Sequence, residues 1–259
     1  MKIIRTLEEL KLFVSKKKQI GKTIGFVPTM GFLHAGHISL VNSSKNSTDL
    51  TIASIYVNPS QFNESSDFIN YPKDEKKDLK LLQESNCDAV FIPLQYEIES
   101  IQKLSIDLGA LSHIMEGRFR PGHFKGVVEV VSRFFMVVNP DKAFFGEKDF
   151  QQLFLIKKMV ADFNFPIEIV GCPIIRESNG LAMSSRNSRL SLQGRKKAGF
   201  IFELLNIFTE SKRNFIENKL FELNFELEYL EKHDFGGEQR LFIAVNYDKV
   251  RLIDNIKIN

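Results

Sequence analysis

The stretch KTIGFVPTMGFLHAGH, from Lys22 to His37, decides the fold because it joins a buried strand to a helix through a glycine-containing loop. KTIGFV is apolar enough for a strand covered on both faces, and we expect Pro28 to end it. A second helix is expected to begin in the segment His37–Val41. A strand followed directly by a polar loop and a helix is typical of proteins that bind a ligand at the carboxyl end of a parallel sheet.

The loop carries two of the chain's five histidines, His34 and His37. If the helix begins near Ala35, the two imidazoles lie about one turn apart and can face the same ligand. The free N–H groups at a helix N-terminus suit phosphate, and Gly31 and Gly36 let the backbone approach a nucleotide closely. A two-histidine metal site is an alternative, although no third ligand or HExxH pattern is nearby. Ordinary surface or packing histidines are the other alternative.

Strands and helices alternate along the first two thirds of the chain. Thr6 and Glu9 have the spacing of a capping box, which predicts a helix that stops before Gly21. Further strands are expected at 50–57, 88–93, 142–145 and 167–170, with helices at 74–85, 127–138 and 149–163. This alternation predicts an α/β fold, a Rossmann-like doubly wound parallel sheet.

The residue composition and the pattern of expected elements change near Cys172. A loop rich in small polar residues, PIIRESNGLAMSSRN, is followed by a helical region at 200–232 and two strand-like segments at 241–245 and 250–258. We therefore expect a first domain over 1–172 and a second, smaller α/β domain over 173–259.

Composition narrows the class of protein. Charged residues make up 26% and hydrophobic residues 43% of the 259, and a net charge of +3 is too small to favour nucleic acid or an anionic membrane as a partner. Two distant cysteines, Cys87 and Cys172, form no metal or redox motif, which favours a reducing compartment. The start MKIIRTLEELKLF shows no signal peptide, and no apolar run approaches the ~20 residues that span a bilayer. A cytoplasmic location is expected.

Three further segments carry side chains that could bind a ligand, and each of them also has a purely structural interpretation. In GEKDFQQ, Lys148 can reach phosphate oxygens and the acid beside it could bond a ribose hydroxyl, or the segment is an ordinary acidic helix start. In MSSRN, Ser184, Ser185 and Arg186 make a phosphate clamp, or an ordinary turn and N-cap. EGRFRPGHFKG, residues 116–126, is basic and aromatic and could bind nucleic acid, but it is short and stands alone.

Together these segments resemble the pantothenate synthetase (pantoate–β-alanine ligase) family, in that family's own order along nearly the whole chain. The residues that carry the resemblance are PTMGFLHAGH, YVNPSQF, NYPKDEKKDL, EGRFRPGHFKGV, PDKAFFGEKDFQQL, VGCPIIRESNGLAMSSRNSRL and the terminal RLIDN. The His-x-Gly-His motif alone indicates only the wider nucleotidyltransferase superfamily. The combination with NPSQF and GEKDFQQ is specific to this family.

The resemblance implies an ATP-dependent condensation of (R)-pantoate with β-alanine. Pantoate first attacks ATP to give pantoyl adenylate and pyrophosphate, and the β-alanine amine then releases AMP and pantothenate. It also implies Mg²⁺ with ATP, a homodimer, and a second domain that acts as a lid carrying the MSSR loop. No nucleic acid or membrane partner is expected.

The resemblance assigns roles to particular residues. The catalytic residues are His37, the expected proton donor, with His34, Lys148 and Arg186. The ATP-binding residues are Met30, Gly31, Phe32, Leu33, His34, Ala35, Gly36, His37, Gly146, Glu147, Lys148, Asp149, Ile175, Met183, Ser184, Ser185 and Arg186. Pantoate is assigned to Gln61, Gln152 and Asn58, and β-alanine to Gln61. No protein metal ligand is expected.

The chain departs from the family pattern at Lys73, Asn179 and Met136, and its second domain is shorter than is typical, around 211–237. None of the three is a residue assigned to the chemistry. Two other classes of function stay open. One is a superfamily enzyme that adenylates a different acid or nucleotidylates a phosphorylated acceptor, and the other is a catalytically silent nucleotide- or tRNA-binding protein.

Overall fold

A computed structural model describes residues 1–63, 65–99 and 106–258, and it divides the chain into two compact units. The N-terminal unit comprises Met1–Glu147 and Gln151–Cys172, and the C-terminal unit comprises Lys148–Phe150 and Pro173–Asn259. Lys148–Phe150 therefore group with the second unit, although they lie within the range expected for the first domain.

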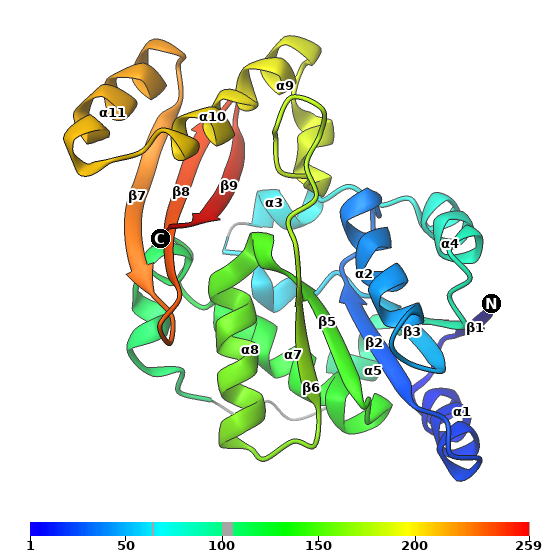
Figure 1. Cartoon of the computed structure of the whole chain (residues 1–259). Coiled ribbons are helices and arrows are strands. Elements are labelled where there is room, and N and C mark those ends of the chain that lie inside the picture. Colours follow the sequence, from blue (N-terminus) through cyan, green and yellow to red (C-terminus); the bar gives the residue numbers. More distant parts are fainter. Residues whose placement is uncertain (64, 100–105, 259) are drawn as a thin grey trace. The chain divides into compact units, whose positions relative to one another are not determined.

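The N-terminal unit is built on one parallel sheet of six strands in the order β1-β4-β3-β2-β5-β6 (Figure 1). Its strands are β1 (Lys2–Ile4), β2 (Ile24–Thr29), β3 (Leu50–Ile55), β4 (Ala89–Phe91), β5 (Lys142–Gly146) and β6 (Glu168–Cys172). The strand order runs outward in both directions from β2, which is the arrangement of a doubly wound sheet. The expected fold class is confirmed.

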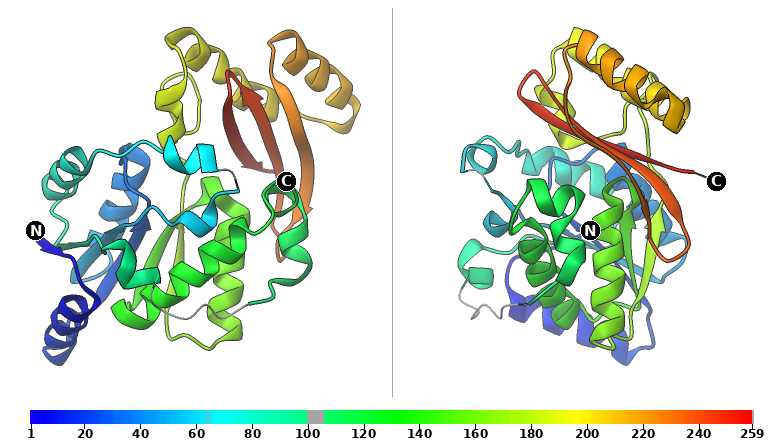
Figure 2. Two further views of the ribbon diagram at one scale, coloured as in Figure 1. Left: turned by 180° about the vertical axis from the view of Figure 1, so that it is seen from behind. Right: turned by 90° about the vertical axis from the view of Figure 1, so that its left-hand side faces the viewer.

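Helices cover both faces of this sheet (Figures 1 and 2). Helices α1 (Leu7–Gln19), α7 (His123–Val138) and α8 (Phe150–Asp162) lie on one face, and α2 (Ala35–Lys45) and α4 (Glu75–Glu84) lie on the other. Right-handed crossovers require this division, because the chain moves along the sheet in opposite directions for the two groups. The shorter helices are α3 (Ser65–Ile69), α5 (Gln95–Glu99), α6 (Met115–Phe119), η1 (Pro59–Gln61), η2 (Gly109–His113) and η3 (Glu147–Asp149).

Successive side chains of the buried strands point to opposite faces of the sheet and pack into two hydrophobic cores, one on each face. Phe26 of β2 packs edge-on against Phe134 and Phe135 of α7, at ring-centroid distances of 6.1 and 6.4 Å. Its neighbour Val27 belongs to the opposite core, which Leu40 of α2 also enters. Both faces of the sheet are apolar, so functional polar groups are confined to the strand ends.

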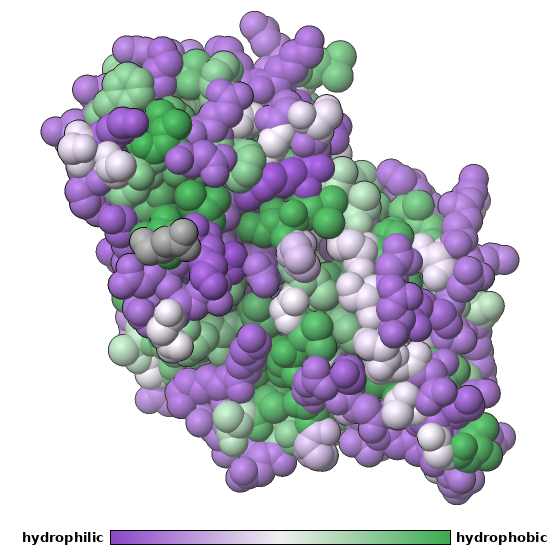
Figure 3. Space-filling view, viewed as in Figure 1, coloured by the Kyte–Doolittle hydropathy of each residue, from purple (hydrophilic) through white to green (hydrophobic). Residues whose placement is uncertain are grey.

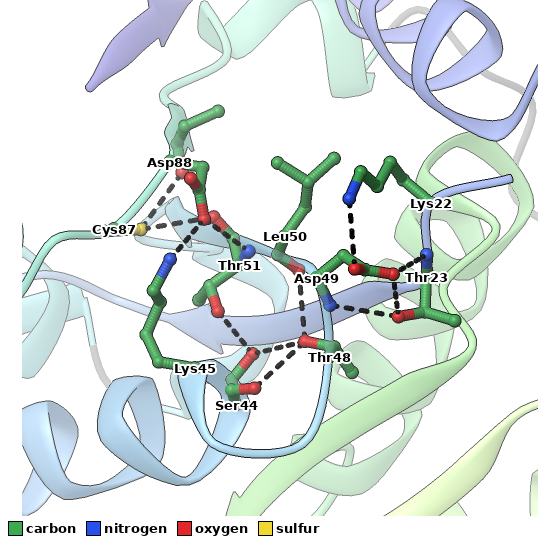
Figure 4. A network of polar contacts seen from close by, with 11 residues as sticks. Lys22, Thr23, Ser44, Lys45, Thr48, Asp49, Leu50, Thr51, Cys87 and Asp88 are labelled. Carbon is green, nitrogen blue, oxygen red and sulfur yellow. Dashed lines mark hydrogen bonds and ion pairs between the residues drawn. The ribbon is translucent and has the colours of Figure 1, made fainter. Parts of the chain in front are cut away.

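The amino end of the sheet is tied together by aspartates that directly precede strands (Figure 4). Asp49 accepts hydrogen bonds from the N–H of Thr23 at 2.9 Å and from its hydroxyl at 2.8 Å. Asp88 accepts from the N–H of Thr51 at 2.8 Å and pairs with Lys45 at 2.9 Å. These carboxylates satisfy backbone donors at the strand starts and have no need of a ligand.

The C-terminal unit packs its helices on an antiparallel sheet of order β7-β8-β9. The strands are β7 (Glu226–Asp234), β8 (Gln239–Tyr247) and β9 (Val250–Lys257), and the helices are α9 (Leu192–Ala198), α10 (Phe200–Asn206), α11 (Arg213–Glu222), η4 (Ser185–Arg189) and η5 (Glu210–Lys212). Its core contains Leu204 and Ile216 from the helices, and Leu241 and Ile243 from β8. Within the described residues, no helix is both long and apolar enough to cross a bilayer.

Several sequence expectations about element bounds are wrong. The region 200–232 is not helical throughout, because Asn224 adopts φ +64° after α11 and the next residues pair with β8, Leu230 opposite Ile243. Its helix-favouring composition is overridden by this tertiary pairing. Pro28 does not end β2: it pairs with Ser54 of β3, beyond the point where β2 pairs with β5, so no second ladder needs its missing N–H.

Two helices begin earlier than the expected segments, and the strand β1 was, like β7, not expected. Helix α7 begins at His123, ahead of the expected start at residue 127. Helix α2 begins at Ala35, ahead of the segment 37–41 but at the start that the pairing of the two imidazoles assumed. The strand β1, Lys2–Ile4, is too short to show a period and exists through its pairing with β4.

Candidate functional site

The loop after β2 is held in an unusual conformation by its own backbone and by one distant carboxylate. Gly31 and Phe32 both have positive φ, +80° and +51°. A Cβ at Gly31 would lie 2.9 Å from Ile55 and 3.0 Å from the Asp78 carboxylate, so glycine is required there for space as well as for φ.

Asp78 of α4 is the carboxylate that fixes this loop. It is 1% exposed and accepts from the N–H of Phe32 at 2.8 Å and of Leu33 at 2.6 Å. Burial raises the pKa of Asp78, and the two N–H donors act against that rise. Asp78 stands in the NYPKDEKKDL segment, but only the folded loop reveals its role, since its partners lie about 46 residues away in sequence.

The two histidines lie side by side at the start of α2. His34 is the N-cap, and its Nδ1 accepts from the N–H of Gly36 at 3.1 Å. The Nδ1 of His37 accepts from the N–H of His34 at 3.3 Å, and the two ring centroids are 4.1 Å apart. Since both Nδ1 atoms accept, each ring when neutral carries its proton on Nε2. The two Nε2–H groups therefore lie beside the positive end of a helix, a placement that suits an anion.

The turn η1 presents Gln61 after β3. Asn58 caps this turn: its Oδ1 accepts from the N–H of Ser60 at 3.3 Å and from the Ser60 hydroxyl at 2.9 Å, while its Nδ2 donates to the Gly126 carbonyl at 2.9 Å. The side-chain amide of Gln61 is different, because it makes no hydrogen bond to any residue that the structure describes. Gln61 is nevertheless only 8% exposed, so its amide is a candidate contact for a bound ligand.

The two glutamines at the start of α8 have opposite environments. Gln151 is 3% exposed; its Nε2 donates to the carbonyls of Leu111 and Ile114, and its Oε1 accepts from the N–H of Glu116. Gln152 is half-buried, and its amide has no hydrogen-bond partner within 1–63, 65–99 and 106–258. Gln151 is a structural residue, and Gln152 is the one available to a ligand.

Lys148 is anchored through its backbone within the C-terminal unit. Its carbonyl accepts from Nδ2 of Asn255 at 3.0 Å, and its ammonium lies 3.6 Å from the Asp149 carboxylate. Asn255 is 1% exposed and comes from β9, in the RLIDN segment. The sequence does not suggest this role for Asn255, because its partner lies about 107 residues away.

The loop carrying Met183, Ser184, Ser185 and Arg186 is ordered inside the C-terminal unit. The N–H of Met183 donates to the carbonyl of Ile175 at 2.9 Å, and the hydroxyl of Ser184 accepts from the N–H of Arg186 at 3.2 Å. Ser184 is thus the N-cap of η4, as the structural alternative expected, and its hydroxyl proton remains a donor. Ser185 is buried and Arg186 is half-buried.

The remaining predicted site residues and the three departures also have defined places. Gly146 ends β5 and Glu147 follows it, while Met30 and Leu33 lie in the loop after β2. Lys73 stacks on the ring of Phe68, and Met136 is 63% exposed on α7. Asn179 donates to the carbonyl of Arg195 and accepts from the N–H of Leu181, so it shapes a turn in the C-terminal unit.

A separate pocket of about 410 Å³ lies on the N-terminal unit, in the hydrophobic area near α8 and β6 (Figure 3). Its lining residues are Lys157, Val160, Ala161, Asn164, Phe165, Ile167 and Ile169. They come from the end of α8, the start of β6 and the segment between them, so the pocket lies at the opposite end of these elements from Gln152 and Cys172. It contains none of the predicted site residues.

The predicted residues fall into two groups. His34, His37, Gln61 and Gln152 belong to the N-terminal unit, all after the carboxyl ends of strands or at the helix starts that follow them. Lys148, Ile175, Ser184 and Arg186 belong to the C-terminal unit. No group of three His, Cys, Asp or Glu side chains placed to hold a metal occurs among the described residues.

The fold and these polar strand-end residues define the class: a doubly wound α/β protein with an anion-suited helix start and neutral amides at the carboxyl end of its parallel sheet. The chain belongs to the pantoate–β-alanine ligase family, whose model matches residues 2–257. It is 46% identical to the pantothenate synthetase of Christiangramia forsetii and 43% identical to that of Porphyromonas gingivalis strain W83. These alignments cover 100% of both chains in the first case and 99% of both in the second.

Solved structures agree with this membership. The pantothenate synthetase of Thermus thermophilus superimposes with a TM-score of 0.91 at 36% identity, covering 99% of each chain. The pantoate–β-alanine ligase of Francisella tularensis, complexed with β,γ-ATP and β-alanine, gives a TM-score of 0.92 at 37% identity over 99% of this chain and 97% of that one. The chain is an enzyme of this family, which ligates pantoate and β-alanine.

Proposed function

We propose that this enzyme condenses (R)-pantoate with β-alanine at the expense of ATP, through a pantoyl-adenylate intermediate, and releases AMP and pyrophosphate. The observation that carries the proposal is the pair of Nε2–H donors, His34 and His37, at the N-terminus of α2 with ring centroids 4.1 Å apart. The β,γ-ATP and β-alanine bound by the Francisella tularensis relative support the same chemistry.

In the first step, a pantoate carboxylate oxygen attacks the α-phosphorus of ATP. A new P–O bond forms, and the bond to the bridging oxygen breaks, with its electron pair leaving on pyrophosphate. The substrate supplies the nucleophile, so the protein's task is to position it and to neutralise charge. His37 acts as proton donor to the phosphate oxygens, and His34 stabilises the same charge.

Cationic and hydroxyl groups complete the ATP contacts. Lys148, Ser184, Ser185 and Arg186 hold the remaining phosphate oxygens and pyrophosphate, for which ammonium, hydroxyl and guanidinium groups are suited. The residues that line the adenosine site are Met30, Gly146, Asp149 and Ile175. The backbone of Gly31, Phe32, Leu33, Ala35, Gly36, Glu147 and Met183 completes the ATP site.

Pantoate binds to neutral amides. Gln61 and Gln152 both donate and accept, which suits the hydroxyl groups of a hydroxy acid without a competing charge. The lack of described hydrogen-bond partners for both amides supports this role. Asn58 completes the pantoate site, chiefly through the turn that it caps. In the second step the β-alanine amine, near Gln61, attacks the acyl carbon, loses a proton, and displaces AMP with the C–O electron pair.

Mg²⁺ is proposed to enter with ATP. Magnesium keeps several waters and takes oxygens from nucleotide phosphates, so it fits a site whose protein groups are donors to those phosphates. The ion would neutralise phosphate charge, and Asp149, whose carboxylate lies 3.6 Å from the Lys148 ammonium, could accept a hydrogen bond from one of its waters.

Pantoate-dependent exchange of pyrophosphate into ATP, measured without β-alanine, tests the proposal. We expect exchange with pantoate and none without it, because adenylation precedes amide formation. Exchange that required β-alanine would contradict the two-step order. Exchange driven by another acid would identify a different adenylating enzyme, and a tRNA mobility shift without any exchange would support the silent binding protein.

We also propose that the enzyme is a cytoplasmic homodimer and that its C-terminal unit acts as a lid. Its partners are small molecules, and neither nucleic acid nor a membrane is among them. Two free, buried cysteines support a reducing compartment: burial raises the pKa of the Cys87 thiol to about 11 and also raises that of Cys172. Light scattering on purified enzyme tests the dimer, and fractionation of the source cells tests the location.

A further inference from the structure

The turn that carries Gln61 is seated on the first turn of α7. The Gln61 carbonyl accepts a hydrogen bond from Nδ1 of His123 at 2.8 Å, and Nη2 of Arg120 lies 3.4 Å from the same oxygen. His123 is 8% exposed and lies about 62 residues away in sequence, within the EGRFRPGHFKG segment. The proposed function assigns no role to this segment.

The partners of His123 decide its tautomer. A carbonyl can only accept, so Nδ1 carries the proton. Nε2 lies 3.0 Å from Nη1 of Arg120, which can only donate, so Nε2 accepts. The ring is therefore neutral in this arrangement, with both nitrogens engaged and its plane fixed from two sides.

The other end of the same turn is fixed to the same helix. Asn58 donates to the Gly126 carbonyl at 2.9 Å. A Cβ on Gly126 would lie 2.4 Å from the Ser60 carbonyl oxygen, so only glycine lets η1 lie this close to α7. Two hydrogen bonds with the first turn of α7, one donated by His123 and one accepted by the Gly126 carbonyl, thus fix both ends of the three-residue η1.

The network continues to the second proposed pantoate contact. Arg120 donates to the Glu116 carboxylate at 3.5 Å, and the Glu116 N–H donates to Oε1 of Gln151 at 3.1 Å. Gln151 directly precedes Gln152 in α8. One chain of hydrogen bonds therefore joins the backbone that carries Gln61 to the backbone that carries Gln152.

We propose that His123 is a positioning residue for pantoate: its Nδ1–H holds the Gln61 carbonyl and so orients the peptide plane from which the Gln61 amide projects. This inference rests on the proposed role of Gln61. His123 itself does not contact the substrate. A misplacement of about 1 Å in such a contact can cost on the order of 100-fold in rate, so an indirect holder can matter as much as a direct one.

Three single variants and one double variant of the full-length enzyme test this. His123→Ala removes the donor, and His123→Asn puts an amide N–H close to the position of Nδ1. Gln61→Ala removes the pantoate contact, and Gln61→Ala/His123→Ala combines the two. His233→Ala is the matched control, since His233 lies on β7 of the C-terminal unit and pairs with Glu231 at 2.8 Å. Steady-state exchange gives KM and kcat for pantoate, and calorimetry gives the ATP affinity.

We expect His123→Ala to lower kcat/KM for pantoate by roughly 10- to 100-fold with unchanged ATP affinity. His123→Asn should restore most of this loss, and His233→Ala should behave as the parent. The double variant should be no worse than Gln61→Ala alone, because one residue acts through the other. A merely structural role would lower ATP affinity and the melting temperature together and would leave His123→Asn as poor as His123→Ala.

Independent, multiplying losses in the double variant would overturn the inference, as would normal pantoate kinetics in His123→Ala. Normal pantoate kinetics in Gln61→Ala would instead contradict the proposed role of Gln61. An impaired Gln61→Ala beside a normal His123→Ala would overturn the positioning role alone.

Discussion

The two ends of the parallel sheet in the N-terminal unit are both polar, but their polar groups are engaged in opposite ways. At the amino end, Asp49 and Asp88 accept from Thr23 and Thr51 N–H groups and pair with Lys22 and Lys45 (Figure 4). After the carboxyl ends, the amides of Gln61 and Gln152 have no hydrogen-bond partner within the described part of the chain.

This difference separates structural from functional polarity. A polar group that is satisfied by the protein contributes to stability, whereas a largely buried amide without a protein partner is costly unless a ligand or water completes it. The contrast holds even between neighbours, since Gln151 is fully engaged and Gln152 is not. Substitutions at the two ends should therefore have separable effects on folding and on activity.

The largest effect is expected at His37. His37→Ala should lower the rate of pantoate-dependent pyrophosphate exchange on the order of 10²- to 10³-fold, because it removes the donor that we propose for the transition state. Stability should fall by less than about 1 kcal/mol, the size of a lost helix cap. Exchange kinetics with thermal unfolding measure both quantities. An active His37→Ala enzyme would return the histidine pair to a packing role.

The next effect is expected at Gln61. Gln61→Ala should lower kcat/KM for pantoate by about 10- to 100-fold and impair the reaction of preformed pantoyl adenylate with β-alanine as well. ATP affinity should be retained, because the proposed phosphate contacts lie on other segments. Calorimetry and single-turnover kinetics measure these steps. A Gln61→Ala enzyme that loses ATP affinity but converts pantoyl adenylate at the parent rate would contradict the assignment of Gln61 to the pantoate site.

A change at the opposite end should affect folding and spare the chemistry. Asp88→Ala should reduce the free energy of unfolding by about 1–3 kcal/mol, because it leaves the Thr51 N–H without its acceptor and Lys45 without its partner. The kcat per folded molecule should equal that of the parent. Urea unfolding and active-site titration measure the two. If fully folded Asp88→Ala enzyme lost activity, this would contradict the claim that the amino end of the sheet serves stability and the carboxyl end serves activity.

The smallest effect is a pH dependence at Asp49. Hydrogen bonds from the Thr23 N–H, the Thr23 hydroxyl and Lys22 lower the pKa of Asp49 from 3.8 to about 2. A folded pKa below the unfolded one stabilises the fold above pH 3.8, and this contribution is lost as the pH falls from 3.8 to about 2. Melting curves of the parent and of Asp49→Asn should therefore differ at about pH 6 and converge near pH 2. Because Asp49 is exposed, salt should reduce the difference.

Local signals in the sequence were sufficient for much of the fold. The capping box of Thr6 and Glu9 forms as expected at the start of α1, and the apolar runs at β2 and β3 are buried parallel strands. The expectation failed where pairing overrode composition: β7 lies in a Phe-, Leu- and Glu-rich region and exists because β8 pairs with it. The three-residue β1 likewise has no period to detect.

The sequence by itself determined which chemical groups this protein has and roughly where along the chain they stand. The groups concerned follow strand ends or lie in polar loops: His34, Gln61, Lys148 and Arg186. Strand-like and helix-like hydrophobic patterns alternate along the chain, and each pattern can be recognised from neighbouring residues alone, so the sequence predicts this arrangement. Only the tertiary structure decided which partners hold them: Asp78 fixes the loop before His34, and His123 fixes the backbone of Gln61. These partners lie tens of residues away, and a hydrogen bond between distant segments has no local pattern, because it depends on how the whole sheet assembles.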